Sequence, residues 1–181
     1  VTTTADPPAS VRHRVVAIGT EVLGGTRLPV LAGPRHGADM VHVSLRRRHG
    51  LPGAADELAQ VRDLTAGPLV VEPFSADDLP AVVRFGDGIV VRGEWMQDFR
   101  LLAAVGRTGL PVVLHRGAHC SIEEWLSSVE YVRAEGNDDA AIAFEHSPTA
   151  AVIILLDVSG SMGTERKLEL AKRATATAID G

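Results

Sequence analysis

Several ionisable side chains in this sequence stand directly after short apolar runs. Glu72 follows Leu-Val-Val, His115 and Arg116 follow Val-Val-Leu, and Glu94 comes shortly after another such run. If these runs are strands, we interpret Glu72, Glu94 and Arg116 as an ion-paired rim at the strand ends. By the same interpretation, His115 is a hydrogen-bonded histidine of the core.

A metal site is the alternative chemistry for this rim. His36, His115, His119 and His146 would supply imidazole nitrogens, which are common ligands of transition metals. Their spacing gives this hypothesis no direct support, so the ion-paired rim is the preferred interpretation.

An alternating pattern of elements must position these side chains. Short β-branched runs alternate with amphipathic stretches, which is typical of parallel strands joined by helices, so the chain is of the α/β class. Several runs are apolar throughout, as strands covered on both faces are. The expected strands are residues 14–18, 28–32, 39–43, 69–72, 88–91, 112–115, 141–144 and 152–156. The expected helices are residues 54–64, 76–85, 96–105, 122–135 and 165–179.

Two helix starts carry capping residues, whereas the start of the sheet is irregular. Ser75 and Ser121 are placed to cap helices, and Glu124 completes a capping box with Ser121. Glycines between the first two expected strands predict an N-terminal β-hairpin that acts as a cap. Residues 33–38 are too few for a helix that crosses back along a parallel sheet. Either a helix has been lost there, or the flanking strands are not parallel neighbours.

The composition limits the classes of function. With 45% hydrophobic and 23% charged residues, the 181-residue chain is globular, and its net charge of −5 gives no general attraction to nucleic acid or an anionic membrane. We interpret the basic run 46–49 as a solvated loop. The longest apolar run, residues 150–156, is far shorter than the roughly 20 residues of a membrane-spanning helix.

The ends and the cysteine content indicate a location. Residues 1–12 have neither the basic nor the apolar region of a signal peptide and are expected to form a disordered tail. The single cysteine, Cys120, excludes an internal disulfide and suits a reducing compartment. We therefore expect a cytoplasmic protein.

Residues 86–137 contain several motifs in unbroken register over two strand and helix units. They include Arg-Gly-Glu-Trp-Met-Gln at 92–97, Leu-His-Arg-Gly at 114–117 and Ser-Ile-Glu-Glu-Trp-Leu from residue 121. This stretch resembles type I 3-deoxy-heptulosonate-7-phosphate (DAHP) synthases. Further pieces resemble the first, third and sixth barrel strands of that family: residues 29–34, 69–73 and 141–145. The resemblance implies a partial (β/α) aldolase-type TIM-barrel-like domain over residues 13–147, since a complete barrel needs roughly 250 residues.

The resemblance also implies a reaction. It is an aldol-type condensation of phosphoenolpyruvate with erythrose 4-phosphate, used in aromatic amino acid biosynthesis and assisted by Mg²⁺ or Mn²⁺ at the carboxyl ends of the strands. Glu72, Arg116 and Glu145 match the family at the site, and they are the catalytic candidates together with His115. Arg116 and His115 are the substrate-binding candidates.

Most other positions of the family's site differ. Arg35 stands in place of a metal-ligand cysteine, and a guanidinium does not coordinate a metal. Glu94 replaces an arginine that holds phosphoenolpyruvate, and its charge would repel that anion. His115 replaces a substrate-binding lysine and is mostly neutral at pH 7. His146 replaces another arginine, and the Lys-Pro-Arg-Thr loop is absent around residues 44–50. These differences favour a pseudoenzyme.

Residues 150–162 form an apolar run that ends in Asp-x-Ser-x-Ser-Met. Together with the following helical pattern, this run resembles the opening of a von Willebrand factor A (VWA) domain, a Rossmann-like strand and helix. The resemblance implies that Asp157, Ser159 and Ser161 give hard oxygen donors to Mg²⁺ in a metal-ion-dependent adhesion site. A boundary near residues 147–149 would then separate a VWA-like fragment, residues 150–181. The alternative is one more sheet strand at 152–156, with Asp157 capping the next helix.

Three functions remain open after these observations. The preferred hypothesis is a degenerate, non-catalytic DAHP synthase relative that acts as a binding or scaffolding module, with metal contacts at Asp157, Ser159 and Ser161. Its ligand would be a protein partner, a second copy or a phosphorylated small molecule. The second is an active 3-deoxy-7-phosphoheptulonate synthase-like transferase whose site a partner chain completes. The third is a VWA-type, Mg²⁺-dependent protein-interaction module. A truncated reading frame is one explanation for the shortened barrel.

Overall fold

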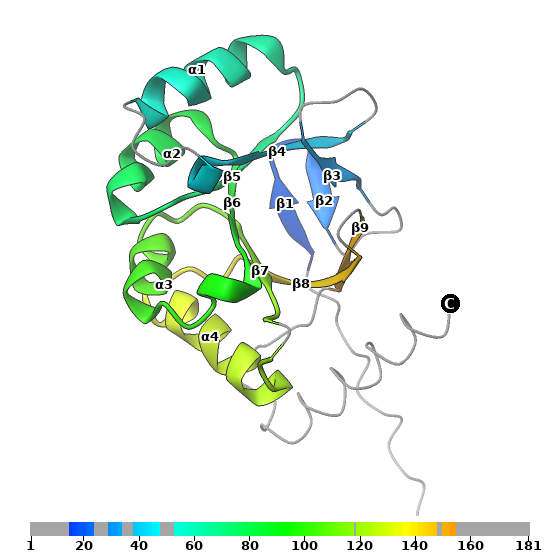
Figure 1. Ribbon diagram of the computed structural model, residues 1–181, viewed down its shortest axis with the longest axis vertical. Coiled ribbons are helices and arrows are strands. Elements are labelled where there is room, and N and C mark those ends of the chain that lie inside the picture. Colours follow the sequence, from blue (N-terminus) through cyan, green and yellow to red (C-terminus); the bar gives the residue numbers. More distant parts are fainter. Residues whose placement is uncertain are drawn as a thin grey trace, which may run out of the picture.

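One curled sheet organises the chain, for which the computed structural model describes residues 15–23, 29–33, 38–47, 53–117, 119–147 and 150–154 (Figure 1). For residues 140–154 the description covers the backbone. Within these residues the strand order is sequential from β3 to β9, with β3 to β8 parallel and β9 antiparallel to β8. The strands are β3 (Leu31–Ala32), β4 (Met40–Ser44), β5 (Leu69–Glu72), β6 (Gly88–Val91), β7 (Val112–His115), β8 (Ala140–Ser147) and β9 (Ala150–Ile154).

Helices cover the outer face of this sheet (Figure 1). The α-helices are α1 (Ala54–Leu64), α2 (Leu79–Phe85), α3 (Phe99–Gly106) and α4 (Ile122–Ala134). Short 3-10 turns precede α1, α2 and α3: η1 (Leu45–Arg47), η2 (Ala76–Asp78) and η3 (Gly93–Trp95). The connecting helices between successive parallel strands give the α/β half-barrel that the sequence pattern predicts.

The helix predictions hold where the local signal is strong. The bounds of α1 agree with the expected 54–64, and Ser121 and Glu124 form the expected capping box of α4. The helix expected at 76–85 is divided into η2 and α2, because Ser75 and Asp78 form a capping box around the short turn. The helix expected at 96–105 begins at Phe99, since the carboxylate of Asp98 caps it by accepting from Leu101 N at 3.0 Å.

The N-terminal hairpin exists, but its predicted partner is wrong. β1 (Val16–Ile18) pairs with β2 (Glu21–Leu23), and not with residues 28–32. Gly19, with a φ of 56°, makes a two-residue turn, and glycine at the first turn position suits the twist of such hairpins. Residues 31–32 instead form β3, the first strand of the parallel sheet.

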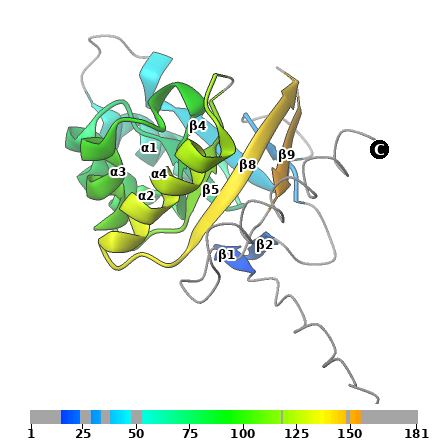
Figure 2. The same cartoon turned by 90° about the horizontal axis from the view of Figure 1, so that it is seen from below.

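The short connection before β4 is also explained. Because β3 and β4 are parallel neighbours, with Leu31 opposite Met40, the crossover helix between them has been lost. At the other end of the sheet, the strand expected at 152–156 lies at Ala150–Ile154 and pairs with β8, as Figure 2 shows. The sequence allowed this segment to be one more strand of the sheet, and the pairing with β8 agrees with that alternative. Asp157, Ser159 and Ser161 lie outside the described residues, as does the helix expected at 165–179.

The central strands are buried on both faces. One face packs under the helices, where Val71, Ile89, Leu114 and Trp125 belong to one apolar cluster. The other face lies inside the curl of the sheet, where the hairpin is seated (Figure 1). The inner cluster consists of Val16, Ile18, Leu23, Met40, Val70, Val90 and Val113. The hairpin therefore covers the inner face of the half-barrel.

None of the helices described in this chain is long and apolar enough to span a membrane.

Truncation of the hairpin's buried contact tests this role. Ile18 is fully buried against the inner cluster, so Ile18→Ala is expected to lower the free energy of unfolding by about 2–5 kcal/mol. Val22 lies on the same hairpin and is exposed, so Val22→Ala is expected to change it by no more than about 0.5 kcal/mol. Urea denaturation measures both, and equal effects would contradict the closing role of the hairpin.

Candidate functional site

A polar layer lies next to the inner apolar cluster, toward the carboxyl ends of the strands. Side chains alternate across a strand, so residues two positions beyond Met40, Val70, Val90 and Val113 face the same interior. Those residues are His42, Glu72, Arg92 and His115. Glu72 and His115 are among the residues predicted from the sequence, and the alternation along each strand identifies His42 and Arg92.

The carboxylate of Glu72 is the most buried charge in this layer. Its side chain is 3% exposed, and Arg46 Nε lies 3.3 Å from Glu72 Oε1. His42 Nε2 lies 3.8 Å from Glu72 Oε2. Breaking such a buried pair by removing one partner is costly, because the other charge is left uncompensated. The Arg46 ion pair is therefore what allows Glu72 to sit inside the half-barrel.

Arg46 itself is packed between aromatic rings. Its guanidinium carbon lies 3.8 Å from the centre of the Trp95 ring and 5.8 Å from that of Phe74. Burial lowers the pKa of Arg46, against the opposing effect of Glu72 and other nearby carboxylates. The interpretation of this residue as part of a solvated loop is wrong, since its side chain is only 12% exposed. Its partners come from distant parts of the sequence and gave no local signal.

His115 is buried at the end of β7 without a hydrogen-bond partner. The residue is 8% exposed, and neither ring nitrogen is hydrogen-bonded within the described part of the chain. Burial, followed by the charges of Arg92 and His42, lowers the pKa of His115 to about 4, although Glu94 opposes the shift. The expected core position is confirmed, whereas the expected hydrogen bond is not found. At neutral pH this imidazole is uncharged.

The remaining rim residues are engaged by the chain's own groups. Arg92 Nε lies 3.6 Å from Glu94 Oε2, so Glu94 takes part in the expected ion-paired rim. Arg116 differs from that prediction, because its Nε and Nη2 donate to the carbonyl oxygen of Cys120 at 3.0 and 2.7 Å. Its guanidinium stabilises the turn after β7.

Two glycines bring the loops after β6 and β7 into backbone contact. A Cβ on Gly93 would lie 2.6 Å from Gly117 Cα, so a side chain has no room there. The amide of Gly117 donates to Met96 Sδ at 3.1 Å, which joins the same two loops. This contact holds the turn that carries Glu94 and Trp95 close to the end of β7.

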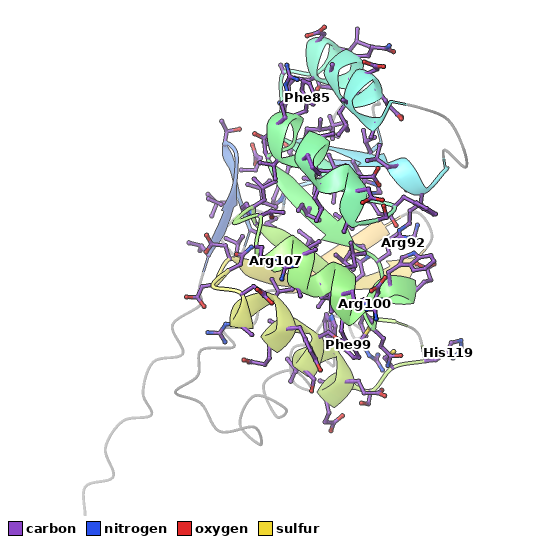
Figure 3. All side chains as sticks on the ribbon, turned by 90° about the vertical axis from the view of Figure 1, so that its left-hand side faces the viewer. Phe85, Arg92, Phe99, Arg100, Arg107 and His119 are labelled. Carbon is purple, nitrogen blue, oxygen red and sulfur yellow. The ribbon has the colours of Figure 1, made fainter. Side chains whose placement is uncertain are left out.

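The four-histidine metal hypothesis receives no support. His115 is buried, whereas His119 is exposed and projects away from the ribbon (Figure 3). Among the residues whose positions are described, no three His, Cys, Asp or Glu side chains gather as a metal site would need. The other residues named from the sequence fall outside the described side chains: Arg35, His36, Glu145, His146, Asp157, Ser159 and Ser161.

Comparisons with known proteins find similarity to the same family that the motifs resemble. No family model matches the chain. A 69-residue stretch is 42% identical to phospho-2-dehydro-3-deoxyheptonate aldolase of Thermotoga maritima, covering 38% of this chain and 20% of that protein. The chain resembles DAHP synthases. Its structure superimposes on the Thermotoga maritima DAHP synthase crystal structure with a TM-score of 0.63 and 26% identity, covering 71% of this chain and 44% of that one.

A truncated form of the same Thermotoga maritima DAHP synthase gives a TM-score of 0.61 at 26% identity, over 71% of this chain and 55% of that one. The chain thus spans about half the length of these solved structures. Both comparisons match a partial α/β aldolase-type fold, in agreement with the curled parallel sheet and its outer helices.

Closing the space at the glycine contact is expected to destabilise the site. Gly93→Ala should lower the free energy of unfolding by about 1–3 kcal/mol, because the new Cβ meets backbone atoms that have little room to move. A Cβ on Gly33 would meet no atom within 4 Å, so Gly33→Ala is the matched control and should stay within about 0.5 kcal/mol. Urea denaturation compares them, and an unaffected Gly93→Ala would contradict the contact.

The low pKa of His115 predicts a stability change with pH. Unfolded histidine takes up a proton below about 6.5, whereas His115 in the folded chain does so only near 4. Between these values the unfolded state binds more protons, so stability falls as pH falls from 6.5 to 4, by about 3 kcal/mol from this group.

Urea denaturation at several pH values checks this prediction. His115→Leu should flatten the fall between pH 6.5 and 4, because no imidazole remains to be protonated on unfolding. His119→Gln alters an exposed histidine in the loop after β7 and is the matched control, which should keep the slope of the wild type. If the free energy of unfolding of His115→Leu still fell as steeply between pH 6.5 and 4, the pH dependence would come from other groups.

Proposed function

We propose that this chain is a non-catalytic relative of DAHP synthase that acts as a binding or scaffolding module. One observation carries the proposal: among the described residues, the cationic side chains near the strand ends are already engaged by acceptors of the same chain. Arg46 pairs with Glu72, Arg92 pairs with Glu94, and Arg116 donates to a backbone carbonyl. The similarity to DAHP synthases supports the family relationship and leaves the reaction to be tested.

Condensation of phosphoenolpyruvate with an aldose phosphate needs free cations. A phosphate and a carboxylate are held by charge-assisted hydrogen bonds from arginine or lysine. Arg46 already balances the buried carboxylate of Glu72, and an anion that drew it away would leave that carboxylate uncompensated, which is strongly unfavourable. His115, which replaces the family's lysine, is neutral at pH 7 and supplies no positive charge.

The described residues do not fit the divalent metal that the family resemblance implies. Both oxygens of Glu72 already face Arg46 or His42, and no group of three potential ligands is found in the described ranges. The described strand ends are therefore not suited to bind Mg²⁺ or Mn²⁺ for catalysis. In a scaffolding role the chain would bind a protein partner, either another chain or a second copy. We propose neither nucleic acid nor a membrane surface as its ligand.

A phosphoenolpyruvate consumption assay tests the proposal. The protein is incubated with phosphoenolpyruvate, Mn²⁺ and a panel of aldose phosphates that includes erythrose 4-phosphate. We expect consumption no faster than in the blank without protein, because the described arginines of the site are already engaged by the chain's own acceptors. Turnover that Arg116→Ala abolishes would overturn the proposal in favour of an active transferase. Turnover that Arg116→Ala and Glu72→Gln both leave unchanged would come from a contaminating enzyme.

A further inference from the structure

The surroundings of Arg46 have the composition of a cation site. Glu72 provides a buried carboxylate, the Trp95 ring lies 3.8 Å below the guanidinium carbon, and Phe74 lies at 5.8 Å. We call these three residues, Glu72, Phe74 and Trp95, the cradle. A planar guanidinium stacks on an aromatic face and pairs with a carboxylate, which a compact ammonium group does less well.

Other contacts hold the surroundings of the cradle in place without Arg46. Asp78 and Asp98, whose negative charges act on Arg46, are fixed as helix caps: Asp78 Oδ2 accepts from Phe74 N at 2.7 Å, and Asp98 Oδ1 accepts from Leu101 N at 3.0 Å. The Trp95 amide donates to the carbonyl oxygen of Arg92 at 2.9 Å. The negative field and the ring position therefore belong to the scaffold and would persist after loss of the arginine side chain.

The Arg46 side chain does not fill the cradle with ideal hydrogen-bond geometry. Its Nε is buried and ion-paired with Glu72, but it makes no hydrogen bond of good geometry within the described residues. The tethered Arg46 side chain is therefore an incomplete occupant.

We propose that the cradle is a guanidinium-binding site, which Arg46 fills from within the chain. The ligand class is a guanidinium group, opposite in charge to the phosphate that the family resemblance implies. The inference rests on the proposed loss of catalysis, because an Arg46 side chain that held an anionic substrate would not occupy the cradle. Arg46 then acts as an internal ligand that keeps the site closed to guanidinium compounds in solution.

The experiment removes the Arg46 side chain from the cradle by the substitution Arg46→Ala and adds methylguanidinium as a ligand. Melting temperature and tryptophan fluorescence of Arg46→Ala are recorded against increasing methylguanidinium chloride, with NaCl at equal ionic strength as the reference. Arg100 is an exposed arginine of α3 (Figure 3), so Arg100→Ala is the matched control for loss of a positive charge. Glu72→Gln and Trp95→Leu are each combined with Arg46→Ala to remove one wall of the cradle.

Methylguanidinium is expected to raise the melting temperature of Arg46→Ala by several degrees beyond NaCl and to change its fluorescence in a saturable way. The wild type and Arg100→Ala should bind at least roughly tenfold more weakly, because Arg46 competes from within the chain. Both double variants should lose the response. An equal response in wild type and Arg46→Ala, or a response that Glu72→Gln leaves intact, would overturn the inference.

If Arg46→Ala does not fold by itself, refolding with methylguanidinium replaces the titration. Recovery of cooperative unfolding with methylguanidinium and not with NaCl supports the site, whereas no recovery overturns it. The outcome is separable from that of the proposed function. Turnover of phosphoenolpyruvate by the wild type would overturn the proposed function, whereas an unresponsive Arg46→Ala variant without turnover would overturn only the guanidinium site.

Discussion

Burial on both faces is the constraint from which the rest of this structure follows. Strands β5, β6 and β7 have no exposed face, because helices cover one side and the curl of the sheet encloses the other. The inner face of a half-barrel must be covered by other apolar residues, and Ile18 and its neighbours in the hairpin cover it. The same enclosure then takes in polar residues toward the strand ends, where every charge must find a partner inside.

Glu72 shows how this constraint shapes the site. A carboxylate that is almost completely buried is stable only with a nearby positive charge. Arg46, in the turn that follows β4, provides that charge. Trp95 covers the guanidinium, and the backbone contact between Gly93 and Gly117 keeps the Trp95 turn in place. The strand ends, which hold the chemistry in barrel enzymes, are here held together by ion pairs and backbone contacts within the chain.

Sequence reasoning succeeded where the information is local. The bounds of α1 and the capping of α4 by Ser121 depend on residues within a few positions of one another. The hairpin partner was wrong because pairing depends on which glycine adopts a positive φ, and several glycines were available. Glu72 and His115 were placed at strand ends by their apolar runs, whereas the burial of Arg46 arises from Phe74 and Trp95, which only the fold brings near.

The hairpin also places a condition on the order of folding. Its own pairing joins residues a few positions apart, but its apolar face is covered only when β4 to β7 have assembled, the last of them ending at His115. During synthesis, the hairpin thus emerges well before the strands that bury it. Long-range closure of this kind slows folding and leaves apolar surface open to misassembly in the interval.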